Sequence, residues 1–308
     1  MRVLAACEPV EILCQSPESA RSARVFLDAH AVTAGRVRLH VVPTDRVWLR
    51  DSAPTGVHDA SGRTVLVNWA FNAWAKYANW ERDEQVGQAV ARITGLSRET
   101  PRRKDTGRLI VLEGGGIDVN GEGLLLATEE WLLSQVQVRN PGLTRADYEE
   151  IFAEWLGVRF TIWLGEGCVG DDTHGHVDDV ARFVTPDTIV LAVEDDPADE
   201  NHERSLDNVR RLERLVASGE AGALRVVKLP FPRPVIMNGE RLPASYANFY
   251  ITNGAVLVPT YGCPQDAIAL ERLRPCFPNR EVVGIDCRAL IHQYGSLHCV
   301  TMQIPKAP

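Results

Sequence analysis

The feature that most constrains this chain of 308 residues is a unit that recurs about five times. Each copy reads as two strands joined by a tight turn, then a helix and a further strand. Such a unit cannot bury its apolar face alone, so it must pack against its neighbours. The sequence therefore predicts one α/β domain over residues 1–308 that closes into a five-unit, pseudo-symmetric propeller. The units cover residues 10–42, 53–95, 109–164, 176–229 and 245–285.

Turn and capping residues mark boundaries inside the units. Asn120-Gly121 is a strong hairpin signal. Thr144 and Gly157 predict the two ends of one helix. The first unit has no hairpin partner for its strand at 10–14, and the apolar segment 297–303 has no unit of its own. We expect 297–303 to pair there as a strand and close the ring.

Composition excludes several classes of protein. A content of 45% apolar and 24% charged residues is that of a globular chain and not of a disordered one. The apolar run 188–193 is far shorter than the roughly 20 residues of a membrane-spanning helix. The net charge of −8 argues against a nucleic-acid partner, because phosphate contacts need a basic face.

Cysteine usage bears on the compartment. The seven cysteines form no CxxC pair, which suits free thiols in a reducing environment. Only six residues precede Cys7, whereas the apolar part of a signal peptide needs about 7–15. We therefore expect a cytoplasmic protein. The amphipathic helix face at 204–216 fits the outer shell of a propeller and the contact of a homo-oligomer equally well.

Four short stretches contain the residues best suited to catalysis. Each opens a repeat unit or lies in the closing segment, and equivalent positions in a ring of repeats face the common axis. Their acidic side chains, His176 and Cys299 are therefore expected to meet in one central cleft. The stretches are WLRDSAP (48–54), LEGGG (112–116), HGHVDD (174–179) and GSLHC (295–299).

Three acidic or histidine-rich stretches permit other interpretations. Alternation along a strand at 176–184 would put His174, His176 and Asp178 on one face, as in a zinc site, but no second ligand cluster accompanies them. The glycines after Glu113 lack GxGxxG spacing and a P-loop lysine, and glutamate repels phosphate. The acidic segment 194–203 lacks the spacing of a calcium loop. We therefore expect no metal and no cofactor.

The ordered set of motifs resembles a known family. WLRD, EGGG, GHVDD and LHC, with NWAFNAWAKY (68–77), RNPGLT (139–144) and LPASYANFYI (242–251), resemble the agmatine deiminases, a family that also covers bacterial peptidylarginine deiminase-like proteins. The resemblance extends from about residue 36 to the C-terminus. It implies the five-unit propeller of the guanidine-modifying pentein superfamily, in agreement with the repeats. It also implies a small cationic guanidino substrate, with agmatine converted to N-carbamoylputrescine in putrescine biosynthesis.

Carried over by motif, three residues have implied catalytic roles. Cys299 is similar to the family's nucleophile, His176 to its general acid and base, and Glu113 to the carboxylate that partners the histidine and the guanidinium. The guanidinium carbon is a poor electrophile, so positioning and covalent catalysis are needed. The implied route is thiolate attack, loss of ammonia, and hydrolysis of an amidino-thioether by water.

Three further residues have implied roles in substrate binding. Asp51 and Asp178 are similar to the pair that grips the guanidinium, and Trp48 to an aromatic wall of the pocket. A guanidinium is a planar cation with five N–H donors, so carboxylates both neutralise it and fix its orientation.

The chain departs from the family pattern in three places. Family members begin with an extra segment before the first unit, so the N-terminal unit is expected to be shortened. The loop before the nucleophile, residues 294–297, reads YGSL where the family is richer in glycine and has an asparagine. SAP follows Arg50-Asp51 where glycine before proline is more usual. Deimination of arginine or peptidyl-arginine, and a non-catalytic binding module, remain as alternatives.

Overall fold

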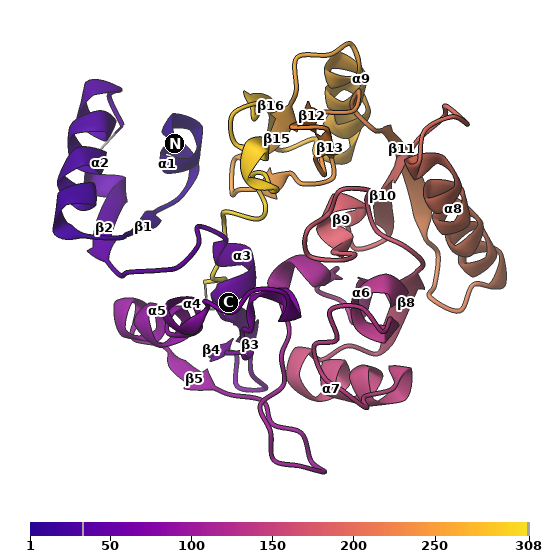
Figure 1. The fold of residues 1–308 in the computed structure, drawn as a ribbon, viewed down its shortest axis with the longest axis horizontal. Coiled ribbons are helices and arrows are strands. Elements are labelled where there is room, and N and C mark those ends of the chain that lie inside the picture. The colour runs from indigo at the N-terminus through magenta and orange to yellow at the C-terminus, as the bar shows by residue number, and fades with distance from the viewer. Residues whose placement is uncertain (33, 307–308) are drawn as a thin grey trace.

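Four of the five expected units fold into three-stranded sheets with one common strand order. A computed structural model describes residues 1–32 and 34–306 (Figure 1). In each of these sheets the first two strands form an antiparallel hairpin, and the third joins the second in parallel after a helical connection. The sheets are β3 (Thr55–His58), β4 (Thr64–Val67) and β5 (Ser97–Glu99); β6 (Asp118–Val119), β7 (Leu124–Thr128) and β8 (Phe160–Leu164); β9 (Ala181–Thr185), β10 (Thr188–Val193) and β11 (Arg225–Pro230); and β14 (Tyr250–Ile251), β15 (Ala255–Thr260) and β16 (Glu281–Asp286).

The first unit has only two strands, as its sequence predicts. β1 (Val10–Cys14) and β2 (Val37–Val41) pair in parallel. Helix α1 (Arg2–Cys7) precedes them and α2 (Pro17–Ala29) connects them. A small extra ribbon, β12 (Ile236–Met237) with β13 (Glu240–Arg241), lies before the last unit.

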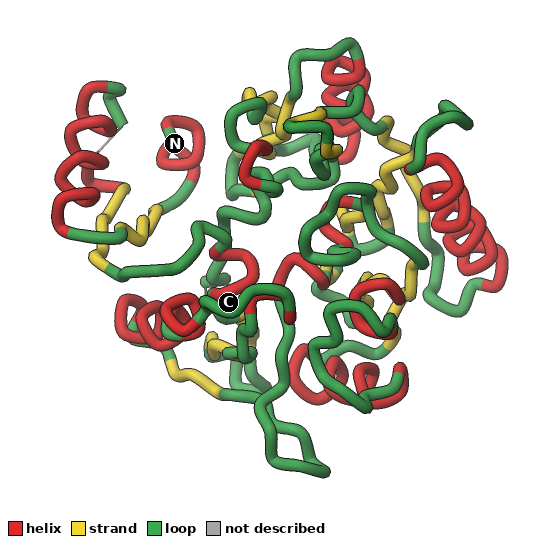
Figure 2. The backbone as a smooth tube through the Cα atoms, viewed as in Figure 1, coloured by secondary structure: helices red, strands yellow, loops and turns green. Residues whose placement is uncertain are grey.

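The longer helices begin and end where the capping residues place them. Thr144 and Asp147 form a capping box at the start of one helix, and Gly157 ends it with a φ of 68°. Helix α8 is the longest, and Figure 2 shows the longer helices at the periphery with loops toward the middle. The α-helices after the first unit are α3 (Leu49–Ser52), α4 (Glu81–Glu84), α5 (Val86–Thr94), α6 (Glu129–Leu133), α7 (Arg145–Leu156), α8 (Asn201–Ser218) and α9 (Gln265–Leu273).

Some predicted strands are wrong in the parts that carry chemical motifs. The expected strand over 176–184 begins only at Ala181, because residues 177–179 form a 3₁₀ turn. The expected strand over 297–303 forms no ladder in the described chain. Its backbone bonds instead to loops and to itself: His298 N–H donates to the carbonyl of Asn248, and Val300 N–H to that of Ser296. In these segments the side chains do not follow the alternation of a strand. This allows them to converge on one point.

The two ends of the chain contact units distant in sequence. Leu4 of α1 packs against Tyr250 and Leu257 of the last sheet. The C-terminal segment returns to the second unit, where Thr64 Oγ1 donates to the carbonyl of Pro305 at 3.2 Å. Within residues 1–32 and 34–306, no helix is long and apolar enough to cross a membrane.

Candidate functional site

Side chains from three units converge around Gly115. A Cβ atom on this glycine would lie 2.6 Å from His176 Nδ1, 2.9 Å from Asp51 Oδ1 and 3.2 Å from Asp178 Oδ2. No other residue type fits without moving these groups. Cys299 joins the cluster with its Sγ 3.7 Å from Asp178 Oδ2. The structure thus brings together residues that the sequence separates by up to 248 positions.

Short helical turns at the start of the units place these side chains. Asp51 lies in α3, Glu113 directly precedes the 3₁₀ turn Gly114–Gly116, and His176 directly precedes the 3₁₀ turn Val177–Asp179. Each turn lies close to the first strand of its unit. The three side chains therefore lie close together, each from a turn near the start of its unit.

Glu113 is fully buried, and hydrogen-bond donors stabilise its ionised form. Trp131 Nε1 donates to its Oε2 at 2.6 Å, and Arg139 Nε donates to its Oε1 at 3.1 Å. Burial would raise the pKa of Glu113, but the charge of Arg139 and the hydrogen bonds from His176 and Trp131 outweigh it and lower this pKa to about 2. Glu113 therefore remains ionised throughout the neutral range.

His176 lies between two carboxylates. Its Nε2 is 3.5 Å from Glu113 Oε2 and its Nδ1 is 3.8 Å from Asp51 Oδ1. Burial opposes a charged imidazole, but the charge of Asp51 and the hydrogen bond to Glu113 prevail and raise the pKa of His176 to about 9. The imidazole is therefore protonated at neutral pH and can donate a proton.

Asp51 is fixed by two donors from different segments. The Gly115 N–H donates to Oδ1 at 3.0 Å, and Trp74 Nε1 donates to Oδ2 at 2.9 Å. Trp74 lies in a turn where Ala73, Trp74 and Ala75 all have φ between 50° and 59°. Such left-handed conformations are costly for residues other than glycine, and they concentrate at functional sites.

The two carboxylate oxygens of Asp178 differ in their hydrogen bonding. Its Oδ2 accepts from His298 Nδ1 at 2.7 Å. Its Oδ1 is buried and has no hydrogen-bond partner among the described residues. Burial raises the pKa of Asp178 to about 7, despite the nearby charge of His176. An unpaired carboxylate oxygen at this depth is suited to accept N–H donors from a bound cation.

Cys299 is held by an asparagine from the last unit. Asn248 Nδ2 donates to Sγ at 3.0 Å and to Asp179 Oδ1 at 3.0 Å, while its Oδ1 accepts from the His298 N–H at 3.0 Å. Burial and the charges of Asp178 and Asp179 raise the pKa of the Cys299 thiol well above its usual value. The thiol is therefore protonated in the free protein.

Trp48 lies beside the nucleophile loop. A Cβ atom on Gly295 would meet its ring at 2.6 Å, so the loop backbone packs directly on the indole. Trp48 also contacts the aromatic cluster of Phe71 and Trp74. This half-buried ring therefore lies against the loop that precedes Cys299.

Sequence reasoning missed the residues that support this set. The motifs RNPGLT, NWAFNAWAKY and LPASYANFYI contain Arg139, Trp74 and Asn248, but no role was expected for them. A signal was present for Asn248, because an asparagine inside a mostly apolar run needs a buried polar partner. The supporting residues are Trp74, Trp131, Arg139, Asn248 and His298.

The zinc interpretation of the HxHxD stretch requires two imidazoles on one face. His174 instead turns toward Ser134, with its Nε2 2.9 Å from Oγ, whereas His176 faces Glu113 and Asp51. No group of three or more histidine, cysteine or acidic side chains suited to a metal ion occurs in residues 1–32 and 34–306.

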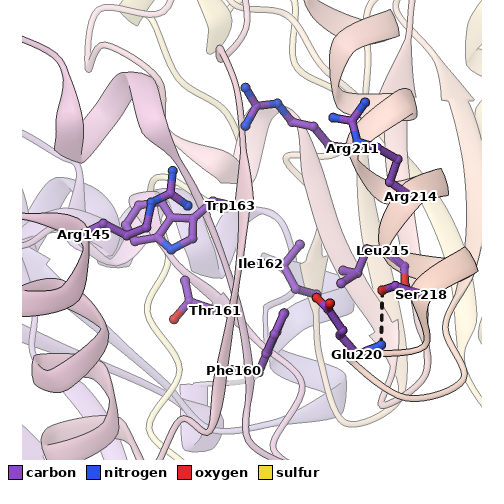
Figure 3. A pocket seen from close by; sticks show the side chains of 10 residues that line it. All are labelled: Arg145, Phe160, Thr161, Ile162, Trp163, Arg211, Arg214, Leu215, Ser218 and Glu220. Atoms are coloured by element: carbon purple, nitrogen blue, oxygen red, sulfur yellow. Dashed lines mark hydrogen bonds between the residues drawn. The ribbon is translucent and has the colours of Figure 1, made fainter.

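A separate cavity of about 370 Å³ lies along β8 and α8 (Figure 3). Two of the charged residues that line it form ion pairs: Arg211 binds Asp207 and Glu129, and Arg145 also binds Glu129. None of the residues that line it belongs to the cluster around Gly115. The cavity therefore lies outside the candidate site.

Comparison with known proteins identifies the family. The model of the Porphyromonas-type peptidyl-arginine deiminase family matches residues 1–305. The chain belongs to this family. The agmatine deiminase of Stutzerimonas stutzeri is 37% identical over 99% of this chain and 85% of its own length. The agmatine deiminase of Ectopseudomonas mendocina is 36% identical over the same shares.

Similar solved structures agree with this family assignment. An agmatine deiminase of C. jejuni with substrate bound has a TM-score of 0.86 and 28% identity over 99% of this chain and 85% of its own. The Enterococcus faecalis agmatine deiminase has a TM-score of 0.88 and 30% identity over 99% and 86%. An amidinotransferase of saxitoxin biosynthesis from Microseira wollei, at 12% identity and a TM-score of 0.55, shares the fold alone.

Proposed function

We propose that this protein hydrolyses agmatine to N-carbamoylputrescine and ammonia. The observation that carries the proposal is the convergence of three carboxylates, a protonated imidazole and a thiol around Gly115. Relatives named agmatine deiminase support the substrate. The set has the charge to bind a guanidinium and a nucleophile to attack its carbon.

The carboxylates would bind the guanidinium. Asp178 offers the unpaired Oδ1, and Asp51 is held in place by Gly115 N–H and Trp74. With no side chain on Gly115, the backbone can lie directly against both carboxylates and the imidazole of His176. Trp48 would flank the chain of the substrate.

Reaction would begin at Cys299. Its sulfur forms a bond to the guanidinium carbon, and the thiol proton leaves to solvent or a neighbouring base. His176 Nε2–H or Nδ1–H protonates one amino group, which departs as ammonia and leaves an amidino-thioether. The now neutral His176 removes a proton from water, which adds to the same carbon. Cleavage of the C–S bond, with loss of the hydroxyl proton to solvent, then gives the ureido product and returns the thiolate, which regains a proton once the cation has left.

The substrate itself would activate the nucleophile. In the free protein the acidic surroundings hold the Cys299 thiol protonated. A bound guanidinium neutralises Asp51 and Asp178 and adds a positive charge near Sγ. Both changes favour the thiolate. Turnover would thus depend on a cation in the site.

The experiment that tests the proposal measures ammonia release from agmatine, free arginine and a peptide ending in arginine. We expect release from agmatine, lost in Cys299→Ala and kept in Cys276→Ala, a matched change of a cysteine outside the site. Release only from arginine or the peptide would keep the mechanism and move the substrate. Silence on all three, with agmatine still binding, would favour the non-catalytic binding module.

The architecture of the whole chain belongs to the same proposal. We infer that residues 1–308 form one domain whose five units close into a ring. The packing of Leu4 on the last sheet supports closure, as does the Arg50 N–H bonded to the Cys299 carbonyl at 3.0 Å. The seven cysteines are unpaired, which supports a cytoplasmic location. The outer face of α8 is the candidate contact of a homo-oligomer, and sedimentation analysis would test whether one forms.

A further inference from the structure

We infer that His298 is a positioning residue, which holds Asp178 so that its free oxygen meets the substrate guanidinium. The inference rests on the proposed function and deepens it. It concerns the residue directly before the nucleophile, for which the motif comparison implied no role.

The contact between the two side chains is short and fully enclosed. His298 Nδ1 lies 2.7 Å from Asp178 Oδ2, and the two side chains are 3% and 0% exposed. Bulk solvent therefore has almost no access to either partner. A hydrogen bond to a carboxylate in such surroundings is stronger than a neutral one and more costly to lose.

The main chain of His298 fixes the direction of its ring. Its N–H donates to Asn248 Oδ1 at 3.0 Å, and its carbonyl accepts from Arg50 Nε at 3.3 Å. The Cys299 carbonyl accepts from the Arg50 N–H at 3.0 Å. The backbone that carries the imidazole is therefore held by hydrogen bonds to both Asn248 and Arg50.

The imidazole donates from Nδ1 as a neutral ring. Burial and the charges of Arg182, Arg50 and His176 lower the pKa of His298 well below its usual value. Asp178 is the acidic group that His298 contacts directly. With Nδ1 as its donor, the ring occupies Oδ2 and leaves Oδ1 as the open acceptor.

This arrangement couples binding to attack. His298 and Cys299 are neighbours in the chain, so the group that orients the binding carboxylate and the group that attacks the carbon move together. Asp178 and Cys299 Sγ are only 3.7 Å apart. A shift of Asp178 would misplace the guanidinium relative to sulfur, and small misplacements are costly to rate.

The test compares His298→Ala with His298→Asn. An asparagine amide can place its N–H near the position of Nδ1, whereas alanine removes the donor. His292→Asn is the matched control, because His292 is exposed in the same C-terminal region. For each variant we would measure kcat, KM and the pH profile of kcat/KM, and the dissociation constant for agmatine in a Cys299→Ala background.

We expect His298→Ala to weaken agmatine binding about 10- to 100-fold, as for the loss of a hydrogen bond to a charged group. Without its donor Asp178 takes up a proton more readily, so the acidic limb of kcat/KM should move to higher pH. His298→Asn should restore most of the binding affinity and return the acidic limb of kcat/KM toward its original pH. Unchanged binding and limb in His298→Ala, or no rescue by a folded His298→Asn, would overturn the inference. Absence of ammonia release from the unmodified protein would instead count against the proposed function, since binding is read separately.

Discussion

At the scale of single residues, two groups in the site change charge near neutrality. Asp178 must be ionised to bind a guanidinium, and its pKa is raised to about 7 by burial. His176 must be protonated to release ammonia, and its pKa is raised to about 9, because Asp51 and Glu113 outweigh the effect of burial. We therefore predict that kcat/KM for agmatine is greatest between about pH 7 and 9.

The sign of each limb follows from the group that titrates. As pH falls below about 7, Asp178 gains a proton and binding is lost; as pH rises above about 9, His176 loses the proton that the leaving group needs. A bound cation favours the Asp178 carboxylate, so the acidic limb of kcat should lie below that of kcat/KM. Initial rates from pH 5 to 10 measure both. An acidic limb at equal pH in the two profiles would contradict the assignment to Asp178.

Asn248 offers a second prediction at this scale. Asn248→Ala removes the donors to Cys299 Sγ and Asp179 Oδ1, together with the side-chain acceptor of the His298 N–H. We expect kcat to fall about 10- to 100-fold, the range for lost hydrogen bonds to groups that carry charge. KM should change less, because the Asn248 side chain bonds directly to none of Asp51, Glu113 and Asp178, and the carbonyl of residue 248 still accepts from the His298 N–H. Steady-state kinetics check this, with the exposed Asn279→Ala as control.

Sequence reasoning selected residues that the structure brings together, and it missed the residues that hold them in place. Asp51, Glu113 and His176 were recognisable from residue type and motif, and the structure places them together. The partners of these residues are ordinary structural residue types. Arg139 and Trp131 acquire their importance only through a distance to Glu113, which no local pattern encodes.

At the scale of elements, predictions succeeded where local signals and burial agreed. The helix between Thr144 and Gly157 and the hairpin at Asn120-Gly121 follow from capping and turn chemistry. The segment 297–303 contains four apolar residues, yet it forms no ladder within residues 1–32 and 34–306. Its backbone is taken up by contacts with Asn248 and with itself, which depend on tertiary structure.

The left-handed turn at residues 73–75 gives a prediction for one element. Ala75 is exposed with a φ of 53°, so replacement by glycine relieves backbone strain without loss of packing. We expect Ala75→Gly to raise the free energy of unfolding by about 1 kcal/mol, the strain relieved less the added chain entropy. Ala153→Gly, at an exposed position inside α7, should lower it by about 1 kcal/mol.

Denaturant unfolding of both variants measures this pair of changes. Opposite signs would show that the turn is left-handed in solution. A loss of stability in Ala75→Gly comparable to that in Ala153→Gly would mean that residue 75 has an ordinary right-handed conformation. Activity should change little, because the Ala75 side chain is exposed and Trp74 keeps its bond to Asp51.

At the scale of the whole molecule, the repeat pattern alone does not say whether the first and last units meet. Leu4 is 8% exposed and packs against Tyr250 and Leu257, and Glu8 accepts from the Tyr250 hydroxyl at 3.0 Å. These contacts join α1 to the last sheet across the length of the chain. The chain runs from the last strand of that sheet to Cys299, so closure would also restrict the movement of Cys299.

Leu4→Ala tests closure. Truncation of a buried leucine should lower the free energy of unfolding by roughly 2–3 kcal/mol. In a closed ring the loss is shared by both partners, so hydrogen exchange should quicken in residues 1–14 and also in 250–258. Val25→Ala, at a position 70% exposed on α2 of the same unit, is the control and should change neither. Faster exchange confined to residues 1–14 would mean that the first unit is attached but does not stabilise the last, and the five units would then form an open chain.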